Sequence, residues 1–274
     1  MGGVACLSAS DALAKWLGDF YPAIQLLFLR GAIAVPLVVV LLLWFQGSQA
    51  LRTKNLGIHA VRGLLNVVSA CSFYFGLTLL PLAEATAIAF AAPLFVIALS
   101  RPLLGEHVER RRWLGALAGF AGVLIVVRPG SASFQPAALL PLTTAVGYAL
   151  MMLTARKIQG TESMLTTMLY IVLAQAVLSV GLQPWYWESV QTPHLPAILA
   201  LSLFSTLGLA LITQGFRIGP VAVVAPFDYC GLLWAGLLGW LLWNELPDAW
   251  TYAGGLVIMA SGIYICFRET RGSR

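Results

Sequence analysis

Charge is what this chain has least of. Asp, Glu, Lys and Arg together make up 10% of its 274 residues, whereas 59% of the residues are apolar. A soluble domain typically carries about 25% charged residues, because water must solvate its surface. The composition therefore excludes an ordinary soluble protein and predicts that lipid is the solvent of this one.

Residues that carry chemistry are scarce as well. The sequence has three histidines and four cysteines: His59, His107, His194, Cys6, Cys71, Cys230 and Cys266. The histidines lie near the ends of apolar runs without a nucleophile or metal set beside them. The cysteines lie in apolar runs without metal-ligand spacing, which is typical of packing residues. No P-loop is present. We therefore expect no metal, no cofactor and no catalytic residue, and ATP-driven pumping by this chain is unsupported.

Apolar runs divide the chain into segments of the length that crosses a bilayer, which is about 20 residues for a helix. The runs fall at 1–18, 21–45, 58–80, 82–104, 112–128, 135–156, 163–183, 196–216, 219–242 and 249–267. They predict an all-α integral membrane protein with ten transmembrane helices.

The distribution of basic residues indicates an orientation. With the N-terminus in the cytoplasm, all but three of the sixteen lysines and arginines lie in cytoplasmic loops or at cytoplasmic helix ends. Arg128 lies outside, and Lys15 and Arg30 lie within spans. This bias follows the positive-inside rule and predicts a multi-pass protein of the inner (plasma) membrane with both termini cytoplasmic. The same bias explains the net charge of +5, so nucleic acid is not an expected partner.

The two halves of the chain match each other at an offset of 139 residues. The anchoring pairs are Pro81 with Pro220, Glu106 with Glu245, and Gly115 with Gly254. Each half holds five predicted helices, so the second half must cross the membrane in the opposite sense. Residues 1–130 and 131–274 are therefore predicted to be two inverted five-helix repeats, which are common in secondary transporters.

Two long stretches resemble the ten-helix EamA-type branch of the drug/metabolite transporter superfamily. They read LPLAEATAIAFAAPLFVIALSRPLLGEHVERRRWLGALAGFAGVLIVVRPG (80–130) and GPVAVVAPFDYCGLLWAGLLGWLLWNELPDAWTYAGGLVIMASGIYI (219–265). Gly105–Glu106 at the end of the fourth run recurs as Asn244–Glu245 at the end of the ninth. The resemblance implies a transporter of amino acids, vitamins, nucleoside-like metabolites or drugs. The PFDY stretch (226–229) is similar to subfamilies for S-adenosylmethionine or riboflavin.

Ionisable residues deep in a membrane segment are candidates for function, because a charge there is costly. At about 1.5 Å per residue, Arg30 and Asp228 lie about 13 Å from their helix ends, close to mid-membrane. Asp11 is at a comparable depth, and Lys15 lies one turn nearer the outside. Asp11 and Lys15 are four residues apart, in the favourable order for an ion pair on one helix face. The alternative is that these charges only pair with each other and fasten helices.

Prolines within the fourth and ninth runs are the second indication of a site. Pro93 and Pro226 each free a backbone carbonyl, which is tolerated only beside protein or a water-filled cavity. The alternative is a pair of harmless kinks. We expect a substrate site whose contributors are Asp228, Tyr229, Pro226, Asp11, Lys15, Trp16, Tyr74, Glu84, Phe90, Tyr148, Gln214 and Trp234.

A second group of residues is predicted to be structural. It comprises Glu106, Glu245, Arg30, Pro93, Gly115 and Gly119. Glu106 and Glu245 are expected to accept hydrogen bonds from the first N–H groups of the helix that follows each of them. Gly115 and Gly119 form a small-residue face for close helix packing, either within the fold or across a homodimer.

The leading interpretation is a secondary transporter that moves a small organic metabolite by rocking its two halves around a central cavity. The partners expected are a small-molecule substrate and the lipid bilayer. A membrane enzyme is a second class, and it lacks a catalytic set. A non-transporting assembly or scaffold subunit is the third class, in which the mid-membrane charges would bind a partner helix.

Overall fold

The structure, a computed structural model, describes residues 2–92, 95, 98–99, 102–103, 110–128, 135–158, 162–218 and 230–272. Every regular element in these ranges is a helix. The long helices are α1 (Gly2–Leu17), α2 (Ala23–Gln46), α3 (Leu56–Leu79), α4 (Leu82–Ala89), α6 (Arg110–Val127), α7 (Leu139–Ile158), α8 (Met164–Val180), α10 (Leu195–Ile218), α12 (Cys230–Trp243) and α13 (Ala249–Gly272). The short ones are η1 (Ser48–Leu51), η2 (Pro136–Ala138), α9 (Gln183–Tyr186) and η3 (Thr192–His194).

Local chemistry explains several helix ends. Pro22 precedes α2, and Gly47 ends it with a φ of 76°, a conformation that glycine adopts without steric cost. Ser163 caps α8 by accepting a hydrogen bond from the Thr166 N–H at 3.0 Å. Asn244 ends α12 in the left-handed conformation, with a φ of 54°. Asparagine tolerates that conformation better than most residues do.

Three helices in the described ranges are long and apolar enough to cross a membrane: Ala23–Gln46, Leu56–Leu79 and Thr192–Ile212. Shorter apolar helices accompany them at Trp113–Val127, Pro136–Met151, Met164–Val180 and Gly231–Trp243. Large apolar side chains cover the outside of the bundle, and Trp44 of α2 is 82% exposed. A soluble monomer rarely exposes so much apolar surface, so these faces suit lipid.

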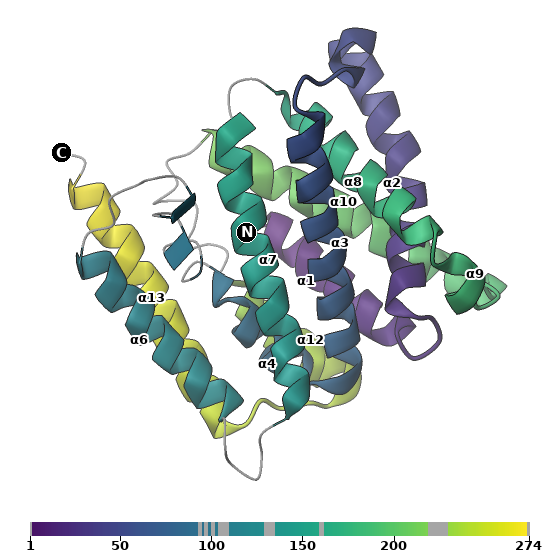
Figure 1. The fold of residues 1–274 in the computed structure, drawn as a ribbon. Helices are drawn as coiled ribbons and strands as arrows, with labels where there is room; N and C mark the ends of the chain where they lie inside the picture. The colour runs from purple at the N-terminus through teal and green to yellow at the C-terminus, as the bar shows by residue number, and fades with distance from the viewer. Residues whose placement is uncertain are drawn as a thin grey trace.

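Helices from the two parts of the chain pack against each other in pairs. The main pairs are α6 with α13, α1 with α10, α2 with α8, and α3 with α7. Figure 1 shows α6 and α13 side by side along one flank, apart from the α2–α8 pair on the other. Further contacts join α3 to α8, α10 to α2, α1 to α12, and α4 to both α12 and α7.

Small residues allow these close approaches. A Cβ at Gly31 of α2 would lie 2.9 Å from the Ala176 nitrogen of α8. A Cβ at Gly122 of α6 would lie 2.8 Å from the Gly254 carbonyl oxygen of α13. Gly115 and Gly119 are buried on the same helix, α6. The glycine-rich α6 therefore packs within the fold, against α13.

Candidate functional site

The predicted mid-membrane charges do come together in part. Arg30 of α2 donates a hydrogen bond from Nη1 to the Tyr74 hydroxyl oxygen of α3, at 3.0 Å. Tyr74 is buried, so the bond lies inside the bundle. The positive charge of Arg30 also acts on the Asp11 carboxyl group of α1. Three helices thus contribute one acid, one base and one phenol to a common polar centre.

The predicted pairing of Asp11 with Lys15 is wrong, because Lys15 has another partner. Its Nζ lies 2.7 Å from both carboxylate oxygens of Glu245, 230 residues away. It also donates to the Leu80 carbonyl oxygen at 3.1 Å and lies 5.1 Å from the Trp243 ring centroid. A complete carboxylate, a carbonyl and an aromatic face outcompete a neighbour on the same helix, where an exposed pair contributes only about 0.2–0.5 kcal/mol.

Glu245 also differs from its expected role. Its Oε2 accepts a hydrogen bond from the N–H of Leu82, the first residue of α4, at 3.3 Å. The helix that follows Glu245 is capped by Asp248, whose Oδ1 accepts from the Thr251 N–H at 2.8 Å. The carboxylate of Glu245 therefore joins the end of α12 to the starts of other elements, and does not cap α13.

Asp248 forms a second ion pair at this end of the bundle. Its Oδ2 lies 2.7 Å from Arg128 Nη2, at the end of α6. Partial burial alone would raise the pKa of Asp248, but the hydrogen bonds from Thr251 and the charge of Arg128 hold it below its usual range. The charges of Arg128 and Asp248 both act on Glu84 in the first turn of α4. The loop from Asn244 to Asp248 thus links α1, α4 and α6.

A pocket of about 270 Å³ opens beside the Lys15–Glu245 pair. Its lining consists of Lys15, Asp19, Leu77, Thr78, Leu79, Leu80, Pro81, Trp243 and Glu245. Drug-sized ligands usually occupy pockets of about 300–1,000 Å³, so this one suits a small group. Lys15 is the predicted substrate-site residue that lines it. Sequence reasoning missed Asp19 and Trp243, which a search restricted to mid-membrane depth passes over.

The other described candidates are dispersed. Phe90 and Tyr148 pack in one apolar cluster with residues of α4, α6, α7 and α13. Trp16 contacts the Phe20 and His194 rings, and Gln214 and Trp234 are exposed. Pro93, Glu106, Pro226, Asp228 and Tyr229 lie outside the described residues.

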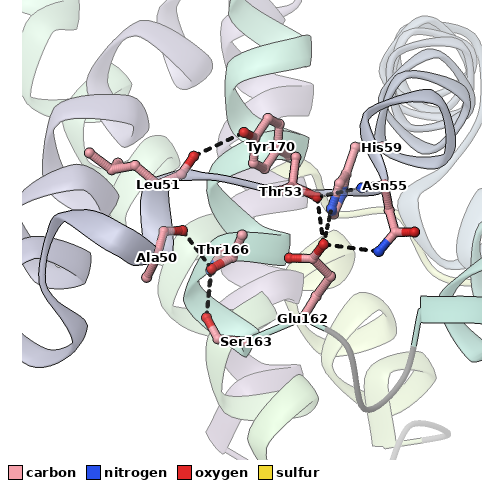
Figure 2. Close-up of polar contacts among 9 residues, drawn as sticks. All are labelled: Ala50, Leu51, Thr53, Asn55, His59, Glu162, Ser163, Thr166 and Tyr170. Carbon is pink, nitrogen blue, oxygen red and sulfur yellow. Dashed lines mark hydrogen bonds and ion pairs between the residues drawn. The ribbon is translucent and has the colours of Figure 1, made fainter.

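A separate polar cluster, which the sequence did not reveal, lies at the opposite end of α3 (Figure 2). Glu162 Oε1 accepts hydrogen bonds from Thr53 at 2.5 Å and Asn55 at 3.0 Å, and lies 3.9 Å from His59 Nε2. The His59 ring stacks on Tyr170 of α8, with 4.6 Å between centroids.

This cluster fastens the segment between α2 and α3 to the start of α8. Tyr170 donates to the Leu51 carbonyl oxygen at 2.9 Å, and Thr166 donates to that of Ala50 at 2.8 Å. Burial alone would raise the pKa of Glu162, but the Thr53 and Asn55 hydrogen bonds and the nearby His59 lower it below its usual value. Across the described residues, no group of three His, Cys, Asp or Glu side chains suits a metal ion.

Comparison with known proteins adds a family. The sequence model of the EamA-like transporter family matches residues 1–128 and again 135–268. An S-adenosylmethionine uptake transporter of Rickettsia prowazekii is 27% identical over 96% of this chain and 90% of its own length. A pseudopaline exporter of Pseudomonas aeruginosa is 28% identical over 93% of this chain and 90% of its own. A riboflavin transporter of Vibrio cholerae is 28% identical over 92% of this chain and 86% of its own.

One solved crystal structure matches the fold over 100% of this chain and 97% of its own, with a TM-score of 0.69 and 23% identity. At that identity, the likeness concerns the fold alone.

Proposed function

The chain belongs to the EamA-like transporter family of membrane proteins, and we propose that it is a secondary transporter that moves a small organic metabolite across the inner membrane by alternating access. The observation that carries the proposal is the family match over both halves of the chain, together with relatives that transport small molecules. The proposal includes ten spans, two inverted repeats of residues 1–130 and 131–274, and both termini in the cytoplasm.

The helix contacts support the inverted repeat. Exchanging the two halves turns the α1–α10 contact into the α7–α3 contact, and α1–α12 into α7–α4, and both members of each pair occur. Individual positions follow the same rule. Ser69 and Gly208 stand 139 residues apart. Ser69 contacts the Cβ position of Gly147 in α7, whereas Gly208 contacts Gly3 and Leu7 in α1.

The same contacts argue that the moving units are not the two halves of the sequence. Helix α1 packs with α10 and α12, whereas α7 packs with α3 and α4. Each group of three combines helices from both halves. The α2–α8 and α6–α13 pairs each join one half to the other. We therefore expect the two three-helix groups to rock against each other, with these two pairs as the pivots.

The polar centre of Asp11, Arg30 and Tyr74 supports a substrate site between these groups. In the proposal, Pro226, Asp228 and Tyr229 form the facing wall on the ninth span. A carboxylate and aromatic rings at mid-membrane depth suit a substrate with a cationic or hydrogen-bond-donating group on a flat or apolar body. S-adenosylmethionine and riboflavin, the substrates in the relatives' names, are the first metabolites to test.

The test is flux in liposomes that contain the purified chain. A panel with labelled S-adenosylmethionine, riboflavin, amino acids and nucleosides is added outside, and uptake is compared with that of protein-free liposomes. We expect saturable uptake of at least one compound. A folded protein that transports no member of the panel, yet binds a partner helix, would instead support the scaffold alternative.

Asp228→Asn is the matched variant for this test. We expect it to insert and fold but to lose most of the flux, whereas Asp228→Glu keeps part of it because the charge remains. If Asp228 only fastens a helix, thermal stability falls first and flux falls in proportion. A folded Asp228→Asn protein with full flux and unchanged affinity would remove Asp228 from the site.

A further inference from the structure

The Lys15–Glu245 pair stands where three helices meet. Lys15 is near the end of α1, Glu245 follows α12, and the Leu82 N–H that Glu245 accepts begins α4. The Lys15 ammonium group has three N–H donors, and the two Glu245 oxygens and the Leu80 carbonyl supply three acceptors. One side chain therefore holds α1 against both α12 and the chain that leads into α4.

The pocket beside this pair has a net negative charge. Its ionisable lining residues are Lys15, Asp19 and Glu245, which leaves one carboxylate without a cationic partner among them. Asp19 is exposed, and the Trp243 ring adds an aromatic face. Carboxylates and an indole face together attract a cation and repel an anion.

The two members of the pair differ in access. The Glu245 side chain is 30% exposed, whereas that of Lys15 is 9% exposed. A cation arriving in the pocket therefore reaches the carboxylate before it reaches the ammonium group. If that cation replaces Lys15 beside Glu245, the carboxylate remains paired throughout, so the cost of leaving a part-buried charge alone is avoided.

We propose that this pocket receives a compact organic cation, which opens the outer end of the bundle by replacing Lys15 as the partner of Glu245. Displacement of Lys15 releases its bond to Leu80 as well, so that α1 separates from α12 and from the start of α4. The ligand shifts the equilibrium because only the open state gives it the carboxylate. This proposal rests on the proposed function, in which this end faces outward and opens during transport.

The test measures access to a buried position behind the pair. Ala83 lies in the first turn of α4 and is 5% exposed, so Ala83→Cys in an otherwise cysteine-free chain reports opening. The rate of modification by a membrane-impermeant maleimide is measured in liposomes from outside. Gly181→Cys is the exposed reference, because no atom lies within 4 Å of its Cβ position.

The probes are choline and 3,3-dimethylbutanol, which have the same shape and differ only in charge. We expect saturating choline to raise the Ala83→Cys rate about tenfold, as for a ligand that binds the open state ten times more tightly. The neutral alcohol should leave the rate unchanged, and neither should affect Gly181→Cys. Equal effects of both probes, or no effect of choline, would overturn the proposal.

Two variants separate the ion-pair mechanism from a general loosening of the fold. Lys15→Met should raise the rate without a ligand, and Glu245→Gln should abolish the response to choline. The charge exchange Lys15→Glu with Glu245→Lys should restore the low ligand-free rate, which a merely unstable protein would not do. Flux is measured separately: failure of this proposal leaves flux intact, whereas failure of the proposed function leaves the choline response measurable.

Discussion

At the scale of residues, the sequence identified the right charges but not their partners. The depths of Asp11, Lys15 and Arg30 follow from counting along apolar runs, and two of these residues do lie in a common polar centre. Helical periodicity compares only neighbours on one helix, so it favoured Asp11 as the partner of Lys15. The real partner, Glu245, comes from packing α12 against α1, which no local pattern encodes.

Asn244 shows a residue-scale pattern that the structure explains. The repeat has glycine at position 105 and asparagine at the equivalent position 244. Asn244 has a φ of 54°, a conformation open to glycine and, among the other residues, chiefly to asparagine. The change from glycine to asparagine is therefore conservative for the backbone.

Tyr74→Phe tests the polar centre. The change removes the hydroxyl that accepts from Arg30 and leaves the Nη1 donor without that partner inside the bundle. We expect the free energy of unfolding to fall by about 1–2 kcal/mol, as for other hydrogen bonds to charged groups. Thermal unfolding in detergent measures the change. Tyr252→Phe is the control, because Tyr252 is 56% exposed and its substitution should be neutral. Equal melting temperatures for both variants would mean that the bond contributes nothing.

At the scale of elements, helix positions were the most predictable feature. The apolar run at 21–45 corresponds to α2 (Ala23–Gln46), and the run at 58–80 corresponds to α3 (Leu56–Leu79). Hydropathy locates such helices because the bilayer sets their length. The loop contacts were not predictable, since the bonds from Thr53 and Asn55 to Glu162 join segments more than 100 residues apart.

Glu162→Gln should make the stability depend less on acid. The folded pKa of Glu162 is below the unfolded value near 4.5, so the carboxylate stabilises the fold at neutral pH. That contribution is fully present above pH 4.5 and is lost as the pH falls through the folded pKa. We therefore expect the wild type to melt above the variant at pH 7 and the two curves to converge below about pH 4.5. A difference that persists unchanged at pH 3 would contradict the assignment.

Gly254→Ala tests the packing of α6 on α13. The added methyl group would lie 2.6 Å from the Gly122 carbonyl oxygen and 2.5 Å from a Val126 methyl group. The helices must separate to admit it, and overpacking of this kind costs about 1–3 kcal/mol. Gly236→Ala in α12 meets no atom within 4 Å, so it should be neutral or stabilising. Thermal stability of the two variants gives the comparison. Equal stability of the two would show that α6 and α13 are not tightly packed.

At the scale of the whole molecule, the fold class followed from composition, but the arrangement of helices did not. Scarcity of charge requires lipid as the solvent and therefore helices whose backbone groups are satisfied internally. Which helices touch depends on glycines and alanines whose partners lie far away in the sequence, such as Gly31 with Ala176. The offset of 139 residues carries part of that information, because equivalent positions make equivalent contacts.

The last prediction is the topology of the whole chain. The structure groups the chain ends of the helices into two sets: Thr53 lies with Glu162, whereas Lys15 lies with Glu245 and Arg128 lies with Asp248. The contact between Gln25 and Glu188 belongs to the second set, since Gln25 follows the end of α1. The bias of basic residues then assigns the first set to the cytoplasm. In a cysteine-free chain, single cysteines at positions 188 and 248 should react with an impermeant maleimide only from outside, and those at 53 and 159 only from the cytoplasmic side. Labelling of position 248 from the cytoplasm would refute both the ten spans and the inverted repeat, because an odd number of helices in each half requires that position to be outside.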